Sequence, residues 1–332
     1  DAGRYITAGL CIVRDPSTRR QNVAIHRLQL LGPDRLGALI LPRHTHLLHR
    51  RAEVRGQPLE CAIVIGADPV TMLASQTDVP FGVDELEVAG ALHGAPLQVT
   101  RCETVDIDVP AQAEIVLEGR ILPGVREPEG PFGEFPRYYG PRSEKEVLEI
   151  TAVTSRRDPV YHTIVPASRE HLLLGAVPRE ASLLDGLRRR FPDVSAVHLT
   201  PGGTFRYHVV VALHPRVPGQ ARNVLLATLG EHVDLKHAVV VDPDVDVFSP
   251  EEVEWAIATR FQGDRDLVIV PGARAASLDP SASGGLGTKL GFDCTIPLDA
   301  DSERYRRIEI PGLRDMRVEA YVDEAARLER SG

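Results

Sequence analysis

The spacing of the apolar runs changes near residue 155, and this change constrains the fold more than any other feature of the sequence. Before it, short β-branched and aliphatic runs alternate with Gly, Pro and Asp, which is typical of the strands of a sheet or barrel. These runs cover residues 5–13, 36–41, 59–65, 97–102 and 113–117. Helical patterns interrupt them over residues 45–55, 70–75 and 83–92, and Asp84 is a suitable N-cap for the last helix.

After residue 155 the pattern predicts strands that alternate with longer helices. Strands are expected over residues 160–165, 196–199, 207–213 and 238–242, and helices over 180–190, 219–229 and 250–260. The nearly continuous apolar run 238–242 favours buried, largely parallel strands in an α/β layer. The segment 277–287, rich in Ser and Gly, is expected to be a mobile loop or lid. We therefore predict a β-rich domain over residues 1–160 and an α/β domain over 161–332.

Composition narrows the class of protein. A length of 332 residues suits two domains of roughly 150 residues each. The formal charge, 38 − 47 = −9, disfavours a nucleic-acid partner, and the absence of about 18 consecutive apolar residues argues against a membrane span. The cysteines form no CxxC pair, which favours a reducing, cytoplasmic compartment. Because the sequence opens at Asp1 without an initiator Met or a signal peptide, we expect that a preceding segment is missing.

The densest chemical signal lies in residues 126–139. There Glu129 and Glu134 bracket the sequence Gly-Pro-Phe-Gly, which cannot continue a helix, so turned chain brings the two carboxylates together. Two nearby carboxylates push their pKa values apart, and one of them can then stay protonated as an acid. An exposed acidic turn is an equally weighted alternative.

A second, more diffuse set consists of Asn22, His44 and Glu85. An amide oxygen, an imidazole and a carboxylate suit a divalent metal such as Mn²⁺ or Mg²⁺. His44 lies at helical spacing with His46 and His49, however, and a surface or capping role is the more common one for a single His.

A third feature is the Asp-rich turn after the strand predicted at 238–242. Open α/β sheets bind ligands at the carboxyl ends of their strands, although a simple acidic turn is at least as consistent with the sequence. No P-loop, no dinucleotide-binding glycine motif after a strand and no nucleophile elbow is present.

Together these residues resemble the UbiD family of decarboxylases, which use prenylated FMN, and the similarity covers nearly the whole chain. The most specific match is Glu129-Gly-Pro-Phe-Gly-Glu134, preceded by the segment 111–119. Further matches lie at residues 3–7, 42–44, 65–69, 83–85 and 289–297. The resemblance implies a split β-barrel cofactor domain, like that of flavin reductases, followed by a C-terminal α/β domain for dimerisation and active-site closure. It also implies that the α/β segment that usually opens the family is missing before Asp1.

The resemblance also implies roles for individual residues. Arg27, Glu129 and Glu134 match the catalytic set. The expected cofactor-binding residues are Asn22, Val23, Ala24, Ile25, His26, Arg27, Arg43, His44, Ser75, Glu85 and Lys236. Asn22, His44 and Glu85 would ligate Mn²⁺, while Ala74, Ser75, Thr77 and Glu85 would surround K⁺. The chain departs from some relatives at Val23, where they have Trp, at Thr77, where they have Met, and at His26, where a small residue is frequent.

The activity implied is the reversible, non-oxidative decarboxylation of an aromatic, heteroaromatic or α,β-unsaturated acid. Arg27 would orient the substrate carboxylate, and Glu134 would supply the proton that replaces CO₂. The implied partners are a flavin prenyltransferase, which supplies the cofactor, and a second copy of the chain in a homodimer or higher oligomer. Two alternatives are a catalytically inactive cofactor-binding or assembly subunit of the same fold and a metal-dependent hydrolase built on His44 and Glu85, for which the HExxH motif is absent.

Overall fold

The computed structural model describes residues 1–312 and residue 317. The chain divides into one compact unit, residues 1–295, and a second unit that begins at Ile296. The described part of the second unit contains a 3₁₀ turn, Ser302–Tyr305. The domain predicted over 161–332 therefore extends beyond the described residues, and its division from 1–160 stays a prediction.

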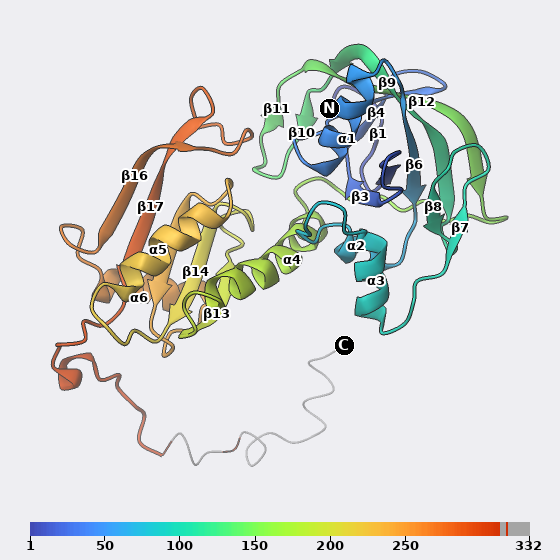
Figure 1. Ribbon diagram of the computed structural model, residues 1–332. Helices are drawn as coiled ribbons and strands as arrows, with labels where there is room; N and C mark the ends of the chain where they lie inside the picture. Colours follow the sequence, from blue (N-terminus) through green and yellow to red (C-terminus); the bar gives the residue numbers. More distant parts are fainter. Residues whose placement is uncertain (313–316, 318–332) are drawn as a thin grey trace. The chain divides into compact units, whose positions relative to one another are not determined.

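The first half of the chain forms an eight-stranded antiparallel sheet that curls into a half-barrel (Figure 1). In spatial order its strands are β1 (Tyr5–Ile6), β4 (Leu28–Leu30), β5 (Arg35–Ala38), β12 (Ser143–Ser155), β9 (Ile115–Glu129), β6 (Leu59–Ile65), β2 (Leu10–Arg14) and β3 (Gln21–Ile25). The long pair β9 and β12 carries two register shifts, and such bulges bend and twist a sheet. At one of them a Cβ on Gly119 would lie 2.1 Å from the carbonyl oxygen of Glu149, so only glycine fits.

Alternate side chains of these strands point into two different apolar clusters. On one face helix α1 (His44–Val54) contributes Leu48 and Ala52. On the other face Met72 of α2 (Pro69–Ala74) and Leu86 of α3 (Glu85–His93) pack against the sheet. Two small sheets, β7 (Val99–Arg101) with β8 (Asp108–Pro110) and β10 (Phe132–Gly133) with β11 (Tyr139–Gly140), complete this part. The half-barrel is thus held from both sides, and it fixes the positions of the loops that leave it.

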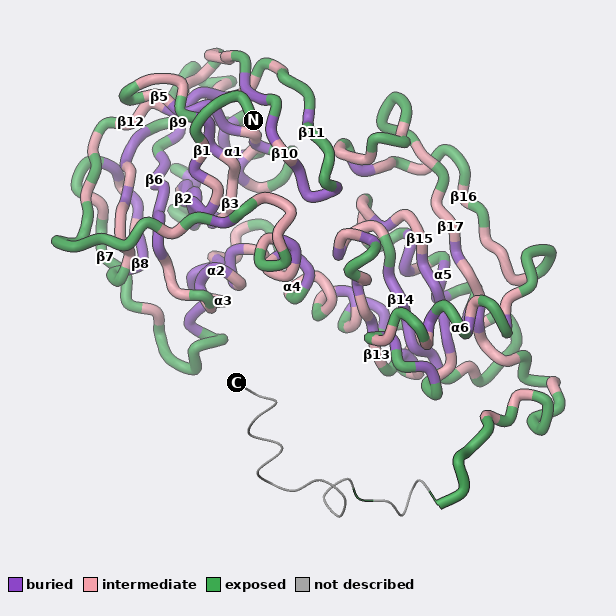
Figure 2. Tube along the Cα trace, turned by 180° about the vertical axis from the view of Figure 1, so that it is seen from behind, coloured by how far each residue is buried: buried purple, intermediate pink, exposed green. Residues whose placement is uncertain are grey.

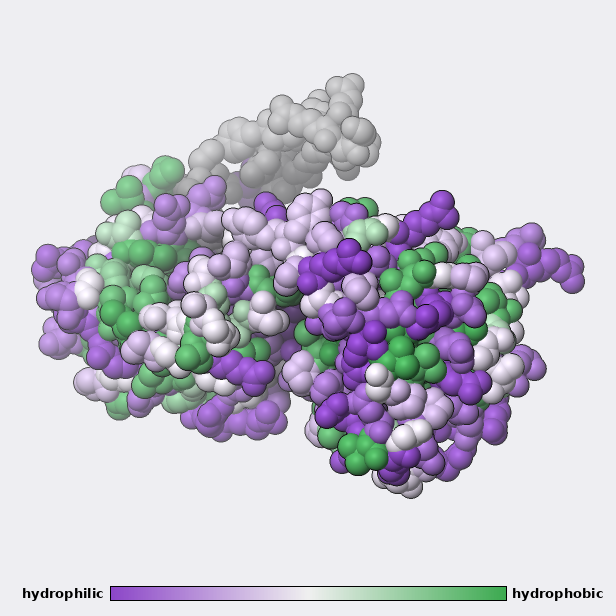
Figure 3. All heavy atoms as spheres, turned by 90° about the horizontal axis from the view of Figure 1, so that it is seen from above, coloured by the Kyte–Doolittle hydropathy of each residue, from purple (hydrophilic) through white to green (hydrophobic). Residues whose placement is uncertain are grey.

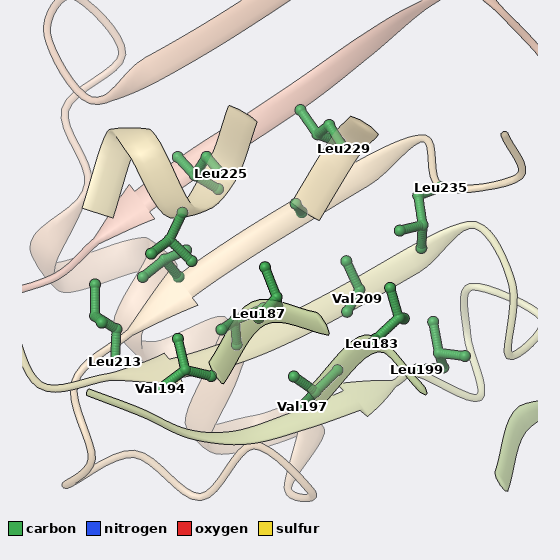
Figure 4. Packing of buried hydrophobic residues seen from close by; sticks show 14 of the residues in the cluster. Leu183, Leu187, Val194, Val197, Leu199, Val209, Leu213, Leu225, Leu229 and Leu235 are labelled. Carbon is green, nitrogen blue, oxygen red and sulfur yellow. The ribbon is translucent and has the colours of Figure 1, made fainter. Parts of the chain in front are cut away.

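The second sheet has the spatial order β13 (Val194–Leu199), β14 (His208–Leu213), β15 (His237–Val241), β17 (Leu286–Cys294) and β16 (Leu267–Arg274). Strands β14, β15 and β17 are parallel, whereas β13 and β16 pair antiparallel, so the expectation of largely parallel strands is wrong at both edges. Helices α4 (Arg169–Arg188) and α5 (Gln220–Glu231) cover one face, with Leu183, Leu187, Leu225 and Leu229 among the packed residues (Figure 4). Helix α6 (Pro250–Arg260) covers the other.

Several predicted elements differ from the structure. Residues 160–165 form no strand, because Val160 and Val165 are both 67% exposed and have no ladder partner in the described chain. Helix α4 runs from Arg169 to Arg188 with Pro178 inside it, so it begins 11 residues (180 − 169) before the helix predicted over 180–190. Strand β12 was not predicted because charged residues interrupt its apolar pattern, and β16 was not predicted because Pro271 and Gly272 end its short apolar run. The loop predicted over 277–287 connects β16 to β17, and its last two residues belong to β17. The mixed α/β architecture with a curled antiparallel sheet is otherwise confirmed.

Burial follows this arrangement. Buried residues concentrate on the strands and on the inner sides of the helices (Figure 2). The face drawn in Figure 3 carries mostly hydrophilic side chains with small apolar groups between them, which is ordinary for a protein surface. In the described residues no helix is both long and apolar enough to cross a membrane. The side chains of Cys11, Cys61, Cys102 and Cys294 are free thiols.

Candidate active site

Two strands of the half-barrel and the small β10–β11 sheet bring the predicted catalytic residues together. Arg27 follows the edge strand β3, Glu129 is the last residue of β9, and Glu134 lies in the turn between β10 and β11. Glu129 and Glu134 stand 102 and 107 positions from Arg27 in the sequence. The antiparallel register of the sheet therefore creates a site that no short segment contains.

Arg27 binds both carboxylates. Its Nε and Nη2 atoms donate to Oε1 and Oε2 of Glu129 at 3.0 and 2.6 Å, and its Nη1 donates to Oε1 of Glu134. Such a bidentate arginine–carboxylate pair is both strong and rigid. Glu129 is fully buried and Glu134 is 8% exposed. The alternative of an exposed acidic turn is therefore wrong, and the expected proximity of the two carboxylates is confirmed.

A ring of supporting contacts fixes Glu129. The hydroxyl of Tyr5 donates to Oε1 of Glu129 at 3.1 Å, and Gln29 accepts a hydrogen bond from the backbone of Gly130 at 3.0 Å. Burial, reinforced by Glu129, raises the pKa of Tyr5 to about 12, so this hydroxyl remains a donor. The ring of Phe132 lies 4.5 Å from that of Tyr5 and 5.2 Å from Cζ of Arg27. No role was predicted for Tyr5 or Phe132, although both lie inside the segments that carried the family resemblance.

Asn22 and Glu85 meet in the buried interior beside β3. Nδ2 of Asn22 donates to Oε1 of Glu85 at 2.8 Å, and the backbone N–H of Val23 donates to Oε2 at 2.7 Å. Asp84 caps α3 as predicted, accepting from the backbone N–H of Leu86, which places Glu85 in the first turn of the helix. Burial raises the pKa of Glu85 to about 7. A buried carboxylate of this kind suits a cation as its partner.

His44 begins α1 and lines a small pocket together with Asn22. The hydroxyl of the next residue, Thr45, donates to Oδ1 of Asn22 at 2.8 Å, and the ring of Phe81 lies edge-on to His44 at 5.3 Å. In the described chain no cluster of three or more His, Cys, Asp or Glu side chains suits a metal ion. The predicted manganese set contains only two residues of these types, with Asn22 as its third member, so it stays a prediction.

The residues expected around potassium lie at the carboxyl end of α2. Ser75 is the C-cap, and its Oγ donates to the backbone oxygen of Met72 at 2.7 Å. The backbone oxygen of Ala74 accepts from the N–H of Thr77 at 3.0 Å. A helix carboxyl end presents oxygens and partial negative charge, which fits a cation in kind. The potassium site stays a prediction.

Most of the remaining cofactor-binding residues lie in the edge strand of the half-barrel or directly after it. Asn22, Val23, Ala24 and Ile25 lie in β3, whose outer edge has no neighbouring strand in the sheet. Burial lowers the pKa of the next residue, His26, to about 4, so this imidazole is neutral at pH 7.

Arg43 and Lys236 are the two expected cofactor-binding cations besides Arg27. Nη2 of Arg43 lies 3.1 Å from Nε2 of His232. Nζ of Lys236 donates to Asp279 at 2.8 Å and to Ser281 at 2.5 Å, both in the loop that precedes β17. This loop therefore holds the ammonium group of Lys236, which was expected to bind the cofactor.

The Asp-rich turn after β15 has a structural role. Arg260 of α6 is 4% exposed and forms ion pairs with Asp242 at 3.0 Å and with Asp244 at 2.6 Å. These contacts favour the simpler interpretation, in which the turn anchors α6 to the sheet.

Comparison with known proteins places this geometry in a family. Residues 1–169 match the family model UbiD, described as the 3-octaprenyl-4-hydroxybenzoate carboxy-lyase Rift-related domain, and residues 172–294 match its C-terminal domain, UbiD_C. An anhydromevalonate phosphate decarboxylase of Methanothermobacter thermautotrophicus is 47% identical over 309 residues, which are 93% of this chain and 73% of that protein.

Solved structures give the same result. The UbiD-class enzyme HmfF from Pelotomaculum thermopropionicum, in complex with FMN, is 55% identical with a TM-score of 0.94, covering 97% of this chain and 72% of that one. An evolved dimeric form of that enzyme, in complex with prFMN, is 52% identical with a TM-score of 0.88, covering 97% and 71%. The apo 3,4-dihydroxybenzoic acid decarboxylase AroY of Klebsiella pneumoniae is 32% identical with a TM-score of 0.85, covering 94% and 68%.

Proposed function

The chain belongs to the UbiD family of carboxy-lyases, and from this premise we propose that it decarboxylates an aromatic, heteroaromatic or α,β-unsaturated acid, reversibly and without oxidation, with prenylated FMN as cofactor. The observation that carries the proposal is the buried contact of Arg27 with Glu129 and Glu134. The similarity to AroY, a 3,4-dihydroxybenzoic acid decarboxylase, supports an aromatic substrate. The similarity to anhydromevalonate phosphate decarboxylase supports an acid without an aromatic ring. The HmfF complex with prFMN supports the cofactor.

The proposed mechanism begins with an exchange of partners on Arg27. Glu129 holds two of its nitrogen atoms, and only Nη1 is bound to Glu134. A substrate carboxylate takes the place of Glu134 on Nη1, because it offers the same charge and geometry. Glu134, released from the guanidinium, takes up a proton from solvent and gives it to the carbon that loses CO₂. Prenylated FMN, when bound, supplies the electron sink for this step.

The chain has suitable residues to hold the cofactor and its ions. The outer edge of β3, where the N–H of Val23 is already bound to Glu85, offers its remaining backbone groups to a flavin ring. We propose Asn22, His44 and Glu85 for Mn²⁺, because Glu85 is a buried carboxylate that Asn22 and Val23 satisfy only with neutral N–H donors. The oxygens of Ala74, Ser75 and Thr77 at the end of α2 are proposed for K⁺, with Glu85 shared.

The proposal also covers the partner enzyme, the oligomeric state, the cellular compartment and the domain boundary. A flavin prenyltransferase would supply the cofactor, and the chain would act as a homodimer or larger homo-oligomer in the cytoplasm. We further propose the division into a cofactor domain over residues 1–160 and a C-terminal domain from 161, which agrees with the change from the antiparallel to the mixed sheet.

The test is carried out on protein coexpressed with a flavin prenyltransferase. Visible absorbance reports the bound cofactor, and CO₂ release is then measured over a panel of aromatic, heteroaromatic and α,β-unsaturated acids. Turnover by the flavin-loaded protein is the expected result. A fully loaded protein that releases no CO₂ from any acid in the panel would support the inactive-subunit alternative instead.

A further inference from the structure

A second buried group of cations lies in the α/β part of the same compact unit. Nη1 of Arg179, on α4, lies 3.5 Å from Oδ2 of Asp234, and Nη1 of Arg206 lies 3.9 Å from the same oxygen. The two arginine side chains are 13% and 17% exposed, and that of Asp234 is 16% exposed. Direct ionic hydrogen bonds measure about 2.7–2.9 Å, so one distant carboxylate serves two guanidinium groups.

The charges in this cluster do not balance. Burial, together with repulsion from Arg206, lowers the pKa of Arg179 to about 10, and burial likewise lowers the pKa of Arg206. His232 also approaches Asp234, at 3.6 Å, but burial lowers its pKa to about 4, so it is neutral at pH 7. Two largely buried guanidinium groups therefore face one largely buried carboxylate. Arg43 and Asp78 add one exposed charge of each sign, and Lys289 adds a further cation near Asp234. An additional anion would stabilise this arrangement.

The turn that carries Arg206 also contains buried polar atoms without partners. Oγ1 of Thr204, Nε of Arg206 and the hydroxyl of Tyr207 have no hydrogen-bond partner among the residues that the structure describes. Thr204 and Phe205 have φ values of 57° and 54°, in the left-handed region that non-glycine residues rarely occupy. Strained backbone and orphaned buried donors together are typical of a ligand-binding turn.

The surrounding residues make room for Arg206 and connect it to the catalytic set. A Cβ on Gly175 of α4 would lie 2.9 Å from Nη2 of Arg206, so a glycine at this position accommodates the guanidinium group. The ring of Phe135 lies 4.7 Å from Cζ of Arg206 and 5.3 Å from the ring of Tyr207. Phe135 directly follows Glu134, the proposed proton donor. The cation cluster is therefore next to the site where the reacting carboxylate would bind.

We propose that Arg179, Arg206 and Tyr207 form a subsite for a second anionic group of the substrate, a carboxylate or a phosphate ester distant from the carboxylate that is lost. This inference rests on the proposed decarboxylase function and adds a substrate class to it. An anion at this position would balance the second arginine and would accept hydrogen bonds from Nε of Arg206 and the Tyr207 hydroxyl. A site with buried donors discriminates strongly against an analogue that leaves them unpaired.

The first experiment uses matched substrates with the flavin-loaded protein. One pair is anhydromevalonate phosphate and dephosphorylated anhydromevalonate, and the other is 4-carboxycinnamate and cinnamate. We expect kcat/KM to favour the anionic member of at least one pair by about 10²-fold, since charged contacts to buried donors give discrimination of this order or more. The pair that shows the preference identifies the anion as a phosphate or a carboxylate. Equal values within both pairs would overturn the proposal.

The second experiment removes each charge. Arg206→Gln and Arg179→Gln should lower the preference about 10-fold or more, mainly through KM, while Arg206→Lys should restore part of it. Arg189→Gln is the matched control, because Arg189 caps the same helix and pairs with Asp185 at the exposed surface. Flavin occupancy is measured in every variant. If Arg206→Gln loses the flavin, the anion is the cofactor phosphate and the assignment to the substrate is wrong.

A binding measurement separates this proposal from the proposed function. If the loaded protein releases CO₂ from none of the four acids, inorganic phosphate is titrated into it by calorimetry. Saturable binding that Arg206→Gln lacks and Arg189→Gln keeps would support the anion subsite even though the decarboxylase proposal fails for these acids. If no such binding is detected, the subsite proposal fails. Decarboxylation without any preference for the anionic substrates refutes the subsite alone.

Discussion

The replacement Glu134→Gln separates the catalytic role of Glu134 from its structural role. In the structure Glu134 accepts one hydrogen bond from Arg27, while Glu129 accepts two. A glutamine oxygen can still accept from Nη1, so the change weakens one ionic hydrogen bond without breaking the arginine's main anchor. The expected loss of stability is about 1 kcal/mol. Turnover should fall much further, by about 10²–10⁴, because the amide has no proton to transfer.

The loss in rate, compared with the loss in stability, distinguishes a catalytic role of Glu134 from a structural one. A loss of 10²–10⁴ in rate corresponds to about 3–5.5 kcal/mol on the barrier, several times the expected stability change. Glu129→Gln provides the contrast, because Glu129 is fully buried and its loss leaves the charge of Arg27 without its bidentate partner. That variant should lose about 3–5 kcal/mol of stability. Urea unfolding and single-substrate kinetics on the same preparations measure both quantities.

Flavin occupancy is the control for the Glu134 variant. The proposed cofactor and metal contacts do not include Glu134, so the absorbance of the loaded Glu134→Gln protein should equal that of wild type. A kcat within a fewfold of wild type at equal occupancy would refute the assignment of Glu134 as proton donor. A variant that unfolds as readily as Glu129→Gln would show instead that Glu134 is mainly structural.

Three further outcomes follow from the structure. Glu85→Gln should lose bound metal and flavin together, as measured by elemental analysis and absorbance, because an amide is a poorer ligand for a divalent ion. Gly119→Ala should lower the unfolding free energy by about 3 kcal/mol or prevent folding, since the methyl group meets the carbonyl of Glu149 in β12. Gly230→Ala is the control, because the space around Gly230 is open, and it should be neutral or slightly stabilising. Burial lowers the folded-state pKa of His171 to about 4, below the unfolded value of 6.5. The neutral imidazole therefore contributes its full share of protein stability above pH 6.5, and this contribution is lost as the pH falls towards 4. The urea midpoint should fall over the same pH range, and it should fall less in His171→Asn.

The sequence predicted the helices of the half-barrel better than its strands, for a physical reason. Helices α2 and α3 follow local start signals, since Asp68 and Asp84 cap them, whereas α1 has no side-chain cap and was found from its apolar spacing. Strand β12 begins Ser-Glu-Lys-Glu, and it is a strand because it pairs with β9 and β5 on either side. Helix α4 shows the same dependence on context, because packing against the sheet tolerates Pro178 inside a 20-residue helix.

The two candidate sites show what sequence reasoning can reach. Glu129 and Glu134 are five positions apart across a turn (134 − 129 = 5), so their proximity followed from local chemistry. Arg27 lies 102 positions from Glu129, and no periodicity joins the two; only the family resemblance placed it there. Neither local spacing nor the family resemblance pointed to the turn that carries Arg206. Its left-handed residues are not glycines, and the carboxylate that its arginine shares with Arg179 enters from a separate loop. The imbalance of charge, which is the property that points to a ligand, arises only once the chain has folded and water has been excluded. Buried groups left without partners therefore add information to a site that motifs alone describe incompletely.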